Sequence, residues 1–379
     1  MRFLFHFYDL QQKAGIQRAI CELSNALVAD GNEVLIVSAT ARCRIAYPLD
    51  ERVSLIVVDH PEPASTGVRG WLRKIAWALR QYLYVSKIAK RLRPAIFVDH
   101  GTSLGLLYPF RMIGDVPFAL QRHFPAKAFP NGRLIYRVLS CLKSSSVVVV
   151  LTESTASELC SYGYKNVYVI PNVLAAGAKP SEYLPQSPKL GLLMGRANPQ
   201  KGFDLFLEAL GRKRIPGWSF QIVGPGVDKD PLLRQLMKKY QLQDTVSLLP
   251  ATNNPFEYIK RASCVIMPSR YEGLGMVALE ALAIGRPVIA SDVDGLNEIV
   301  LDGVNGRCFP CEDVQKLSDC LVSACGDENK LAEYARNAPS FLDKFRAESV
   351  VKAWKNVVMD CTCVDIDAAA KRSSVVTAE

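Results

Sequence analysis

Two glutamates stand out in the stretch SRYEGLGMVALEALAIGRP at 269–287, which is otherwise built for burial. Glu272 and Glu280 flank a glycine-rich turn that follows an apolar strand pattern and opens a helix. The unpaired N–H groups at a helix N-terminus favour an anion, and a carboxylate on an apolar helix needs a partner. A ribose diol could donate two hydrogen bonds to Glu280. The alternatives are a solvated loop acid at 272 and a neighbouring basic partner for Glu280.

Three basic or ionisable residues follow other predicted strands. Arg196 and Lys201 lie in GRANPQKG, a predicted strand-to-helix loop. A guanidinium fork and an ammonium point charge can neutralise a diphosphate, although two solvated loop cations would give the same sequence. His123 ends the strand pattern FALQRH, where a functional side chain is well placed, but a lone histidine is more often a polar surface or core residue.

The elements that carry these residues alternate as strand, helix, strand along the chain. Continuous apolar strands predict parallel sheets covered by helices on both faces. We expect a Rossmann-like domain at 1–172, a linker at 173–189 where Pro, Gly and Ser cluster, and a second Rossmann-like domain at 190–340. A helix at 341–360 is expected to return to the first domain, and 361–379 to be a disordered tail. Ligands should bind at the carboxyl ends of the strands, in a cleft between the domains.

Composition narrows the class of protein. The chain has 379 residues, 49% of them hydrophobic, which is enough for two or three domain cores. Its apolar runs are too short to cross a bilayer, and the first residues read as a buried strand, so we expect a cytoplasmic protein. The eleven cysteines are scattered and read as small buried hydrophobes, and we expect no metal site. A net charge of +9 favours an anionic partner.

A basic helix is predicted at 67–94, with eight basic residues and no acid. One predicted stripe is basic and aromatic, and the other, expected to pack on the sheet, is apolar. Basic residues with aromatic neighbours suit a helix lying on an anionic bilayer, although an ordinary crossover helix with a solvated face is the alternative. The basic stripe holds Arg73, Trp77, Arg80, Tyr84, Lys87 and Arg91, and the apolar stripe holds Leu72, Ile75, Ala76, Leu79, Leu83 and Ala89.

These motifs together resemble glycosyltransferase family 4, the retaining enzymes of the GT-B fold. The family's hallmark is a pair of glutamates separated by seven residues and followed by an A-x-G-x-P-V segment. Further resemblances are the GRANPQKG element, the IVGPG strand end at 222–226 and NGRCF at 305–309. The glutamate hallmark is matched by Glu272, Glu280, Ala281, Ala283, Gly285, Pro287 and Val288.

The resemblance implies a GT-B fold, with two Rossmann-like domains facing a central cleft, and assigns roles to individual residues. Arg196 and Lys201 would hold the diphosphate of the donor, Glu280 its ribose, and Glu272 and His123 its sugar. The implied reaction is metal-independent transfer of a hexosyl group with retention, from a UDP- or GDP-sugar and with no other cofactor. The acceptor would be a glycan or lipid-linked molecule of cell-surface polysaccharide, lipopolysaccharide or glycolipid synthesis. The donor-binding backbone would include Gly15, Gly273, Leu274 and Gly275.

Departures from the family pattern leave other functions open. Ala14 replaces the first residue of the family's glycine pair, so only Gly15 is kept. A nucleotide-sugar epimerase or a phosphorylase would share the fold, and a binding-only descendant would share the motifs. A membrane-surface or nucleic-acid-binding protein could use the basic helix. Under the transferase reading, we expect a peripheral protein at the inner face of the plasma membrane.

Overall fold

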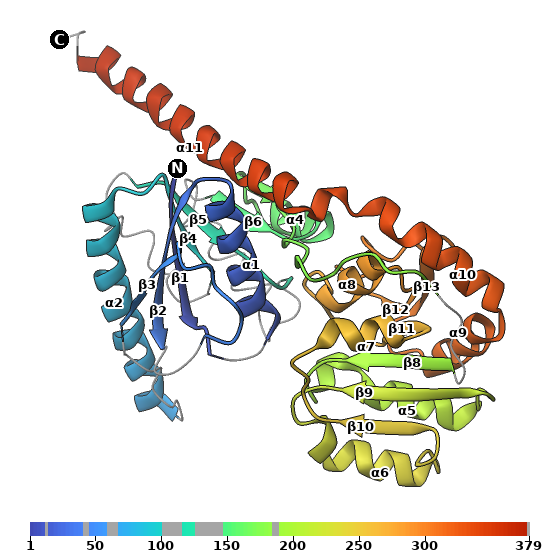
Figure 1. Cartoon of the computed structure of the whole chain (residues 1–379). Helices are drawn as coiled ribbons and strands as arrows, with labels where there is room; N and C mark the ends of the chain where they lie inside the picture. The colour runs from blue at the N-terminus through green and yellow to red at the C-terminus, as the bar shows by residue number, and fades with distance from the viewer. Residues whose placement is uncertain are drawn as a thin grey trace. The chain divides into compact units, whose positions relative to one another are not determined.

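The structure is a computed structural model, and it describes residues 1–11, 14–40, 45–58, 67–100, 116–125, 147–183 and 189–376. The chain divides into two compact units (Figure 1). Unit 1 comprises Met1–Val173 and Phe345–Glu379, and unit 2 comprises Leu174–Lys344.

Unit 1 is built on a parallel seven-stranded sheet in the order β3-β2-β1-β4-β5-β6-β7. The short apolar strands leave no polar face, as expected for a sheet covered on both sides. Their bounds are β1 (Arg2–Asp9), β2 (Glu33–Thr40), β3 (Ser54–Val57), β4 (Ile96–Asp99), β5 (Phe118–Gln121), β6 (Val147–Val150) and β7 (Val167–Val169).

Alternation along β1 divides the core of unit 1 between the two faces of its sheet. Phe3 and Phe5 belong to a cluster with α1 (Gly15–Ala29) and α11 (Ala347–Val376), whereas Leu4 packs with residues of α2 (Gly67–Leu92). Successive strand residues point to opposite faces, so α1 and α11 cover one face and α2 the other. Of the helices that the structure describes in unit 1, α4 (Glu153–Ser161) packs beside β6.

Unit 2 repeats this plan with a parallel six-stranded sheet in the order β10-β9-β8-β11-β12-β13. From β8, the strands β9 and β10 extend the sheet on one side and β11, β12 and β13 extend it on the other, so the switch point of the sheet lies between β8 and β11. The strands are β8 (Lys189–Met194), β9 (Trp218–Val223), β10 (Val246–Leu249), β11 (Cys264–Met267), β12 (Val288–Asp292) and β13 (Gly306–Pro310).

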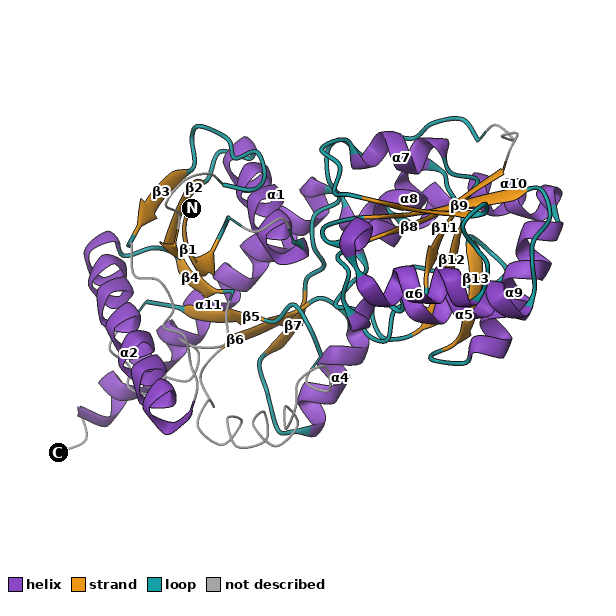
Figure 2. Ribbon diagram, turned by 90° about the horizontal axis from the view of Figure 1, so that it is seen from below, coloured by secondary structure: helices purple, strands orange, loops and turns teal. Residues whose placement is uncertain are grey.

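Helices cover both faces of the unit 2 sheet, with α5, α6 and α9 on one face and α7 and α8 on the other (Figure 2). Two doubly wound Rossmann-like sheets are therefore present, and the expected fold class is confirmed. The helices are α5 (Phe203–Arg212), α6 (Pro231–Lys239), α7 (Pro255–Arg261), α8 (Met276–Ile284), α9 (Val314–Gly326) and α10 (Glu328–Asn337), with short 3₁₀ turns η4 (Pro199–Lys201), η5 (Val227–Lys229), η6 (Ala338–Phe341) and η7 (Asp343–Phe345).

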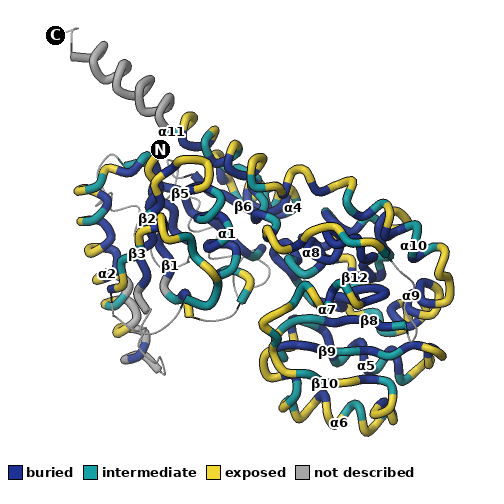
Figure 3. The backbone as a smooth tube through the Cα atoms, in the orientation of Figure 1, coloured by how far each residue is buried: buried dark blue, intermediate teal, exposed yellow. Residues whose placement is uncertain are grey.

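The face that α2 buries differs from the expected one. Tyr82, Val85 and Ala89 are buried against the sheet, but most of the stripe expected to pack there is exposed (Figure 3). The helical wheel alone did not show which of its apolar positions meet the sheet, and Tyr82 and Val85 take that place. Of the expected packing stripe, Leu72, Ala76, Leu79 and Leu83 are exposed, Ala89 is buried, and the side chain of Ile75 lies outside the described part of the structure.

The C-terminal segment also departs from the sequence prediction. Where a disordered tail was expected from residue 361, α11 continues as a helix to Val376, and residues 377–379 lie outside the description. Trp354 of this helix is fully buried in the unit 1 core. Among the described residues, no helix is long and apolar enough to cross a membrane.

Candidate active site

Two loops meet where unit 2 switches the direction of its strand order. One follows β8 and leads through η4 into α5, and the other follows β11 and leads into α8. Since β8 and β11 are parallel neighbours, their carboxyl ends lie at the same edge of the sheet. This is the position at which open α/β sheets bind ligands.

The first loop carries Lys201 and the second carries Glu272, and the two side chains are bonded. The Nζ of Lys201 donates to Glu272 Oε1 over 2.6 Å, and Ser269 Oγ donates to the same oxygen over 2.8 Å. The Lys201 and Glu272 side chains are only 19% and 7% exposed. A buried carboxylate requires such compensation, so the pair fixes both side chains at the strand ends. The structure thus brings together two of the residues predicted from the sequence.

Arg270 ties the two loops together beside this pair. Its guanidinium forms a two-bond fork with Asp204 of α5, at 2.9 and 2.7 Å, and donates to the carbonyl oxygen of Pro199. The backbone N–H of Arg270 donates to Gln200, whose side-chain amide donates back to Tyr271. The Asp204 partner raises the pKa of Arg270 above its usual value. These bonds hold Lys201 against the loop that carries Glu272.

Glycines allow the close approach of these loops. Gly202 has φ of +63°, and a Cβ there would lie 1.8 Å from the carbonyl oxygen of Pro268. Gly275 immediately precedes α8 with φ of +76°, and a Cβ there would lie 2.4 Å from the side chain of Leu296. The left-handed backbone favours glycine at both positions, and at Gly202 the backbone carbonyl of Pro268 also leaves no room for a Cβ.

The other predicted donor-binding residues of unit 2 surround the same edge. Glu280 is 1% exposed on α8, which ends at Gly285 in a left-handed conformation, as expected. Arg196 follows β8 and is exposed. Gly273 and Leu274 lie in the turn before α8, and Leu274 is buried. The placement of Arg196 and Lys201 on one loop follows the prediction, but the contact between Lys201 and Glu272 was not anticipated.

Unit 1 contains a second cluster at the ends of its own strands. His6 of β1 lies opposite Asp99 of β4 in the sheet register, and its Nδ1 is 2.9 Å from Asp99 Oδ1. His100 follows β4 directly, and its ring lies beside that of His123, with centroids 5.5 Å apart and an angle of 23° between the ring planes. His100 Nδ1 lies 3.3 Å from His123 Nε2. Three of the four histidines in the chain therefore lie together with one aspartate.

Burial keeps His100 and His123 neutral. Loss of solvent, followed by the charge of Arg122, lowers the pKa of His123 to about 3. Loss of solvent also lowers the pKa of His100, with smaller contributions from His123 and His6. At neutral pH each ring therefore carries one N–H and one acceptor nitrogen.

Sequence reasoning identified His123 but missed His6, Asp99 and His100. The signal was present, because VDHG at 98–101 places an acid and a histidine at the end of an apolar strand, as QRHF does for His123. Gly15 is the first residue of α1, where a Cβ would meet nothing within 4 Å. The packing of the described protein atoms therefore does not require a glycine at this position.

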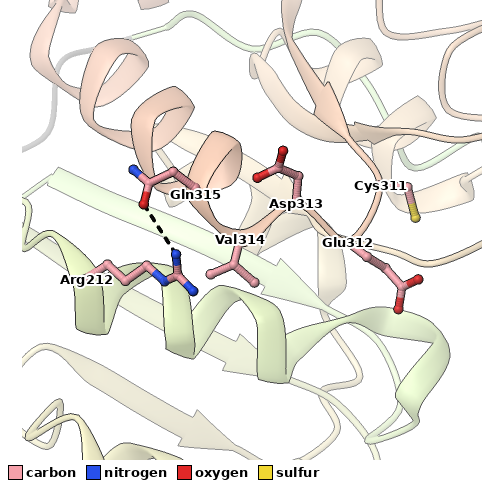
Figure 4. Close-up of a pocket in the computed structure, with 6 residues that line it drawn as sticks. All are labelled: Arg212, Cys311, Glu312, Asp313, Val314 and Gln315. Atoms are coloured by element: carbon pink, nitrogen blue, oxygen red, sulfur yellow. Dashed lines mark hydrogen bonds between the residues drawn. The ribbon is translucent and has the colours of Figure 1, made fainter.

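A pocket of about 450 Å³ lies between α5 and the start of α9 (Figure 4). Arg212 Nη1 donates to Gln315 Oε1 across it over 3.3 Å. The pocket contains none of the residues predicted for the site, but Glu312 of its lining accepts a hydrogen bond from Arg270 Nε over 2.8 Å. Its lining consists of Arg212, Cys311, Glu312, Asp313, Val314 and Gln315.

Comparison with known proteins gives two family matches that follow one another along the chain. Residues 14–174 match the model described as Glycosyltransferase Family 4, and residues 178–341 match the model described as Glycosyl transferases group 1. The boundary between the matches falls near the boundary between the two structural units.

Individual relatives differ in how much of each chain they share. The exopolysaccharide phosphotransferase SCO2592 of Streptomyces coelicolor is 33% identical over 55% of this chain, but the match spans only 23% of that protein. An uncharacterized glycosyltransferase of Haemophilus influenzae is 21% identical over 93% of this chain and 99% of its own length. The amylovoran biosynthesis glycosyltransferase AmsD of Erwinia amylovora is 28% identical over 58% of this chain and 63% of its own.

Solved structures share the fold over nearly the whole chain. Anabaena Alr3699/HepE, crystallised with UDP and glucose, has a TM-score of 0.75 and 17% identity, and the match covers 95% of this chain and 100% of that one. The sucrose-phosphate synthase of Thermosynechococcus elongatus has a TM-score of 0.81 and 17% identity, covering 96% and 99%. At these identities the likeness concerns the fold alone.

Proposed function

Because the chain is a GT-B glycosyltransferase of the family 4 type, we propose that it transfers a hexosyl group from a nucleotide-diphosphate sugar to a glycan or lipid-linked acceptor, with retention of configuration and without a metal. The observation that carries this proposal is the bonded pair of Lys201 and Glu272. It lies at the strand ends where the order of the unit 2 sheet reverses, which is where a nucleotide is expected to bind.

The Lys201–Glu272 pair can bind a nucleotide-sugar donor while its own hydrogen bond remains intact. The ammonium of Lys201 has three N–H groups, so it can keep its bond to Glu272 while it donates to a phosphate oxygen. Both bonds to Glu272 described above end on Oε1, so Oε2 keeps acceptor capacity for a sugar hydroxyl. Arg196, exposed on the same loop, would add a guanidinium fork to the diphosphate, and Glu280 would hold the ribose.

The proposed chemistry is a displacement on one face of the sugar. The bond from the anomeric carbon to the phosphate oxygen breaks, and the acceptor oxygen bonds to that carbon from the same side. The proton of the acceptor hydroxyl passes to the departing phosphate oxygen. Lys201 and Arg196 stabilise the negative charge that grows on the diphosphate, which is the role a divalent ion has in other enzymes.

Relatives suggest the class of donor and product. Alr3699/HepE was crystallised with UDP and glucose, and AmsD is described as an enzyme of amylovoran biosynthesis. We therefore place UDP first among the candidate nucleotides, ahead of GDP, and surface polysaccharide first among the products.

A peripheral membrane location is supported by the exposed side of α2. Leu72 is 55% exposed and Leu79 is 42% exposed, with Arg73 and Arg80 also on the surface. Exposed leucines beside arginines suit an anionic lipid surface, where a lipid-linked acceptor would be presented.

The proposal is tested by measuring the melting temperature with UDP, GDP and ADP. UDP at about one hundred times its Kd should stabilise the protein by about 2.7 kcal/mol. Arg196→Met should weaken this shift, whereas Arg212→Met, on α5 and bonded to Glu208, should leave it unchanged. If no nucleotide raises the melting temperature, a nucleotide-sugar enzyme is excluded.

An epimerase would also bind the nucleotide, so product analysis is needed as well. Incubation with the matching nucleotide sugar alone should return it unchanged apart from slow hydrolysis. Conversion into a stereoisomeric nucleotide sugar without an acceptor would replace the transferase proposal with an epimerase.

A further inference from the structure

The histidine cluster of unit 1 contains more residues than the proposed reaction uses. The transferase proposal assigns a role to His123 alone, yet His100 is also buried, at 3% exposure, with its ring against that of His123. Phe5 packs edge-on against His100, with ring centroids 4.9 Å apart, and so holds the ring in place. The orientation of His100 is therefore fixed by packing on one side and by His123 on the other.

The two nitrogens of His100 have different surroundings. Nδ1 lies 3.3 Å from His123 Nε2, whereas Nε2 is buried and makes no hydrogen bond within the part of the chain that the structure describes. A buried N–H without an acceptor is costlier than a buried lone pair without a donor. The single proton of a neutral His100 ring is therefore favoured on Nδ1, where it can be donated to His123.

This choice determines where the proton of His123 lies. When His100 Nδ1–H donates to His123 Nε2, that nitrogen must act as an acceptor, so the neutral His123 ring carries its proton on Nδ1. As whole residues, His123 is 8% exposed and His100 is 3% exposed, so His123 is the more exposed member of the pair. Burial holds the pKa of His123 at about 3, so the ring is uncharged at neutral pH and His100 affects only which of its nitrogens carries the proton.

We propose that His100 is a positioning residue that fixes the tautomer of His123, so that His123 presents a neutral N–H donor from Nδ1 to an oxygen of the sugar substrate. The identification of the ligand as a sugar rests on the proposed function, whereas the tautomer of His123 does not depend on it. This role of His100 predicts that His123 stabilises its ligand by a directed hydrogen bond and not as a general base.

The tautomer can be observed directly by nuclear magnetic resonance of the full-length protein labelled with ¹⁵N-histidine. Long-range correlations from the ring protons distinguish a protonated from an unprotonated nitrogen, and a His123→Gln variant assigns the signals. At neutral pH, His123 should show a protonated Nδ1 and an unprotonated Nε2. A protonated Nε2, or an even mixture of the two tautomers, would overturn the proposal.

Two substitutions of His100 separate its hydrogen bond from its packing. His100→Asn keeps an N–H donor near the position of Nδ1 and should preserve the His123 tautomer. His100→Phe keeps a ring but removes the donor, and His123 should then become a mixture of tautomers. An unchanged tautomer in His100→Phe would also overturn the proposal. If that variant does not fold, the wild-type and His100→Asn spectra still decide.

Activity supplies the second readout. Loss of one oriented hydrogen bond should lower kcat about tenfold in His100→Phe, with partial recovery in His100→Asn and an unchanged melting shift with UDP. If the tautomer is as expected but no transfer occurs with any donor, the proposed function fails and the positioning role remains. If transfer occurs but His123 shows the other tautomer, the positioning role of His100 fails and the proposed function remains.

Discussion

At the scale of single residues, the bond between Lys201 and Glu272 is both a structural and a functional feature. Breaking a buried ion pair leaves an uncompensated charge, which costs far more than the pair itself contributes. We expect Lys201→Met to lower the free energy of unfolding by roughly 3 kcal/mol, measured by urea denaturation. Lys201→Met combined with Glu272→Gln should recover much of this loss, because the buried charge is then gone.

A surface pair of similar length is the control for this prediction. Lys213 Nζ also lies 2.6 Å from a carboxylate, Asp319, but the two side chains are 50% and 46% exposed. Lys213→Met should therefore change stability by less than about 1 kcal/mol. Equal losses at the two lysines would show that burial does not govern the Lys201 pair.

The buried histidines predict a loss of stability on mild acidification. His123 has a pKa of about 3 in the folded chain and an ordinary value of 6.5, so the unfolded chain binds more protons between these values. Its contribution is complete above pH 6.5 and is lost as the pH falls toward 3. Lowering the pH from about 7 to about 5 should reduce the free energy of unfolding of the wild-type protein by about 2 kcal/mol through His123 alone.

Unfolding curves at a series of pH values check this expectation. A His123→Gln variant should show a shallower dependence on pH over the same range, since it lacks the group that takes up the proton. Parallel curves for the two proteins would mean that His123 does not differ in pKa between the folded and unfolded chains.

Residue types could be read from the sequence more readily than their contacts. Glu272, Lys201 and His123 were each identified from their place after an apolar strand. The partner of Lys201 was not, because residues 201 and 272 are far apart in the chain and only the adjacency of β8 and β11 brings them together. His6 was overlooked because a histidine inside an apolar strand resembles an ordinary core residue.

At the scale of elements, the loop between β8 and α5 depends on one glycine. Gly202 and Gly217 both have positive φ, of +63° and +77°, but only Gly202 has a backbone atom in the way of a Cβ. Gly217→Ala should cost about 1–2 kcal/mol for its backbone conformation. Gly202→Ala should cost more than roughly 3 kcal/mol, because η4 and the Pro268 carbonyl must also separate.

Circular dichroism with urea denaturation would compare the two variants. The Gly202 variant should in addition lose the melting shift with UDP, because Lys201 immediately precedes the glycine. Similar stabilities for the two alanine variants would show that the loop can move at little cost.

The α2 helix shows where periodicity fails as a predictor. Its sequence has more apolar positions than one packing face needs, and Leu79 and Leu83 repeat at helical spacing just as Tyr82 and Val85 do. The face that packs is decided by the shape of the sheet, which a helical wheel does not contain. The correction leaves α2 with leucines and basic residues on the same exposed surface.

Vesicle flotation tests what that surface does. Wild-type protein should float with anionic vesicles at low salt and should be released as salt is added. Leu79→Ser with Leu83→Ser should weaken flotation, whereas Leu232→Ser, which removes a 52% exposed leucine from α6, should not. Absence of wild-type binding at low salt would exclude the membrane role.

At the scale of the whole molecule, the repeated strand and helix pattern was sufficient to predict two parallel sheets. Parallel strands are buried on both faces, so they appear in the sequence as continuous apolar runs that are easily counted. The end of the chain was harder to predict. Beyond residue 360 the pattern has no apolar face to bury, and the structure nevertheless continues α11 to Val376 as one helix.

The same helix completes the core of unit 1. Trp354→Ala would empty a fully buried position in that core and should destabilise unit 1 by about 3–5 kcal/mol. Hydrogen exchange should accelerate in α1 more than in α5. Met359→Ala, at a 47% exposed position of α11, is the control, and equal acceleration in both variants would argue against the role of Trp354.

Unit 2 is formed by one uninterrupted stretch, whereas unit 1 needs residues from both sides of it. During translation, Leu174–Lys344 leaves the ribosome before Trp354 does. Unit 2 can therefore reach its final packing first. Until α11 is available, the seven-stranded sheet of unit 1 has one apolar face partly uncovered. Nascent chains stalled shortly after residue 344 should consequently be bound by chaperones through their first 173 residues.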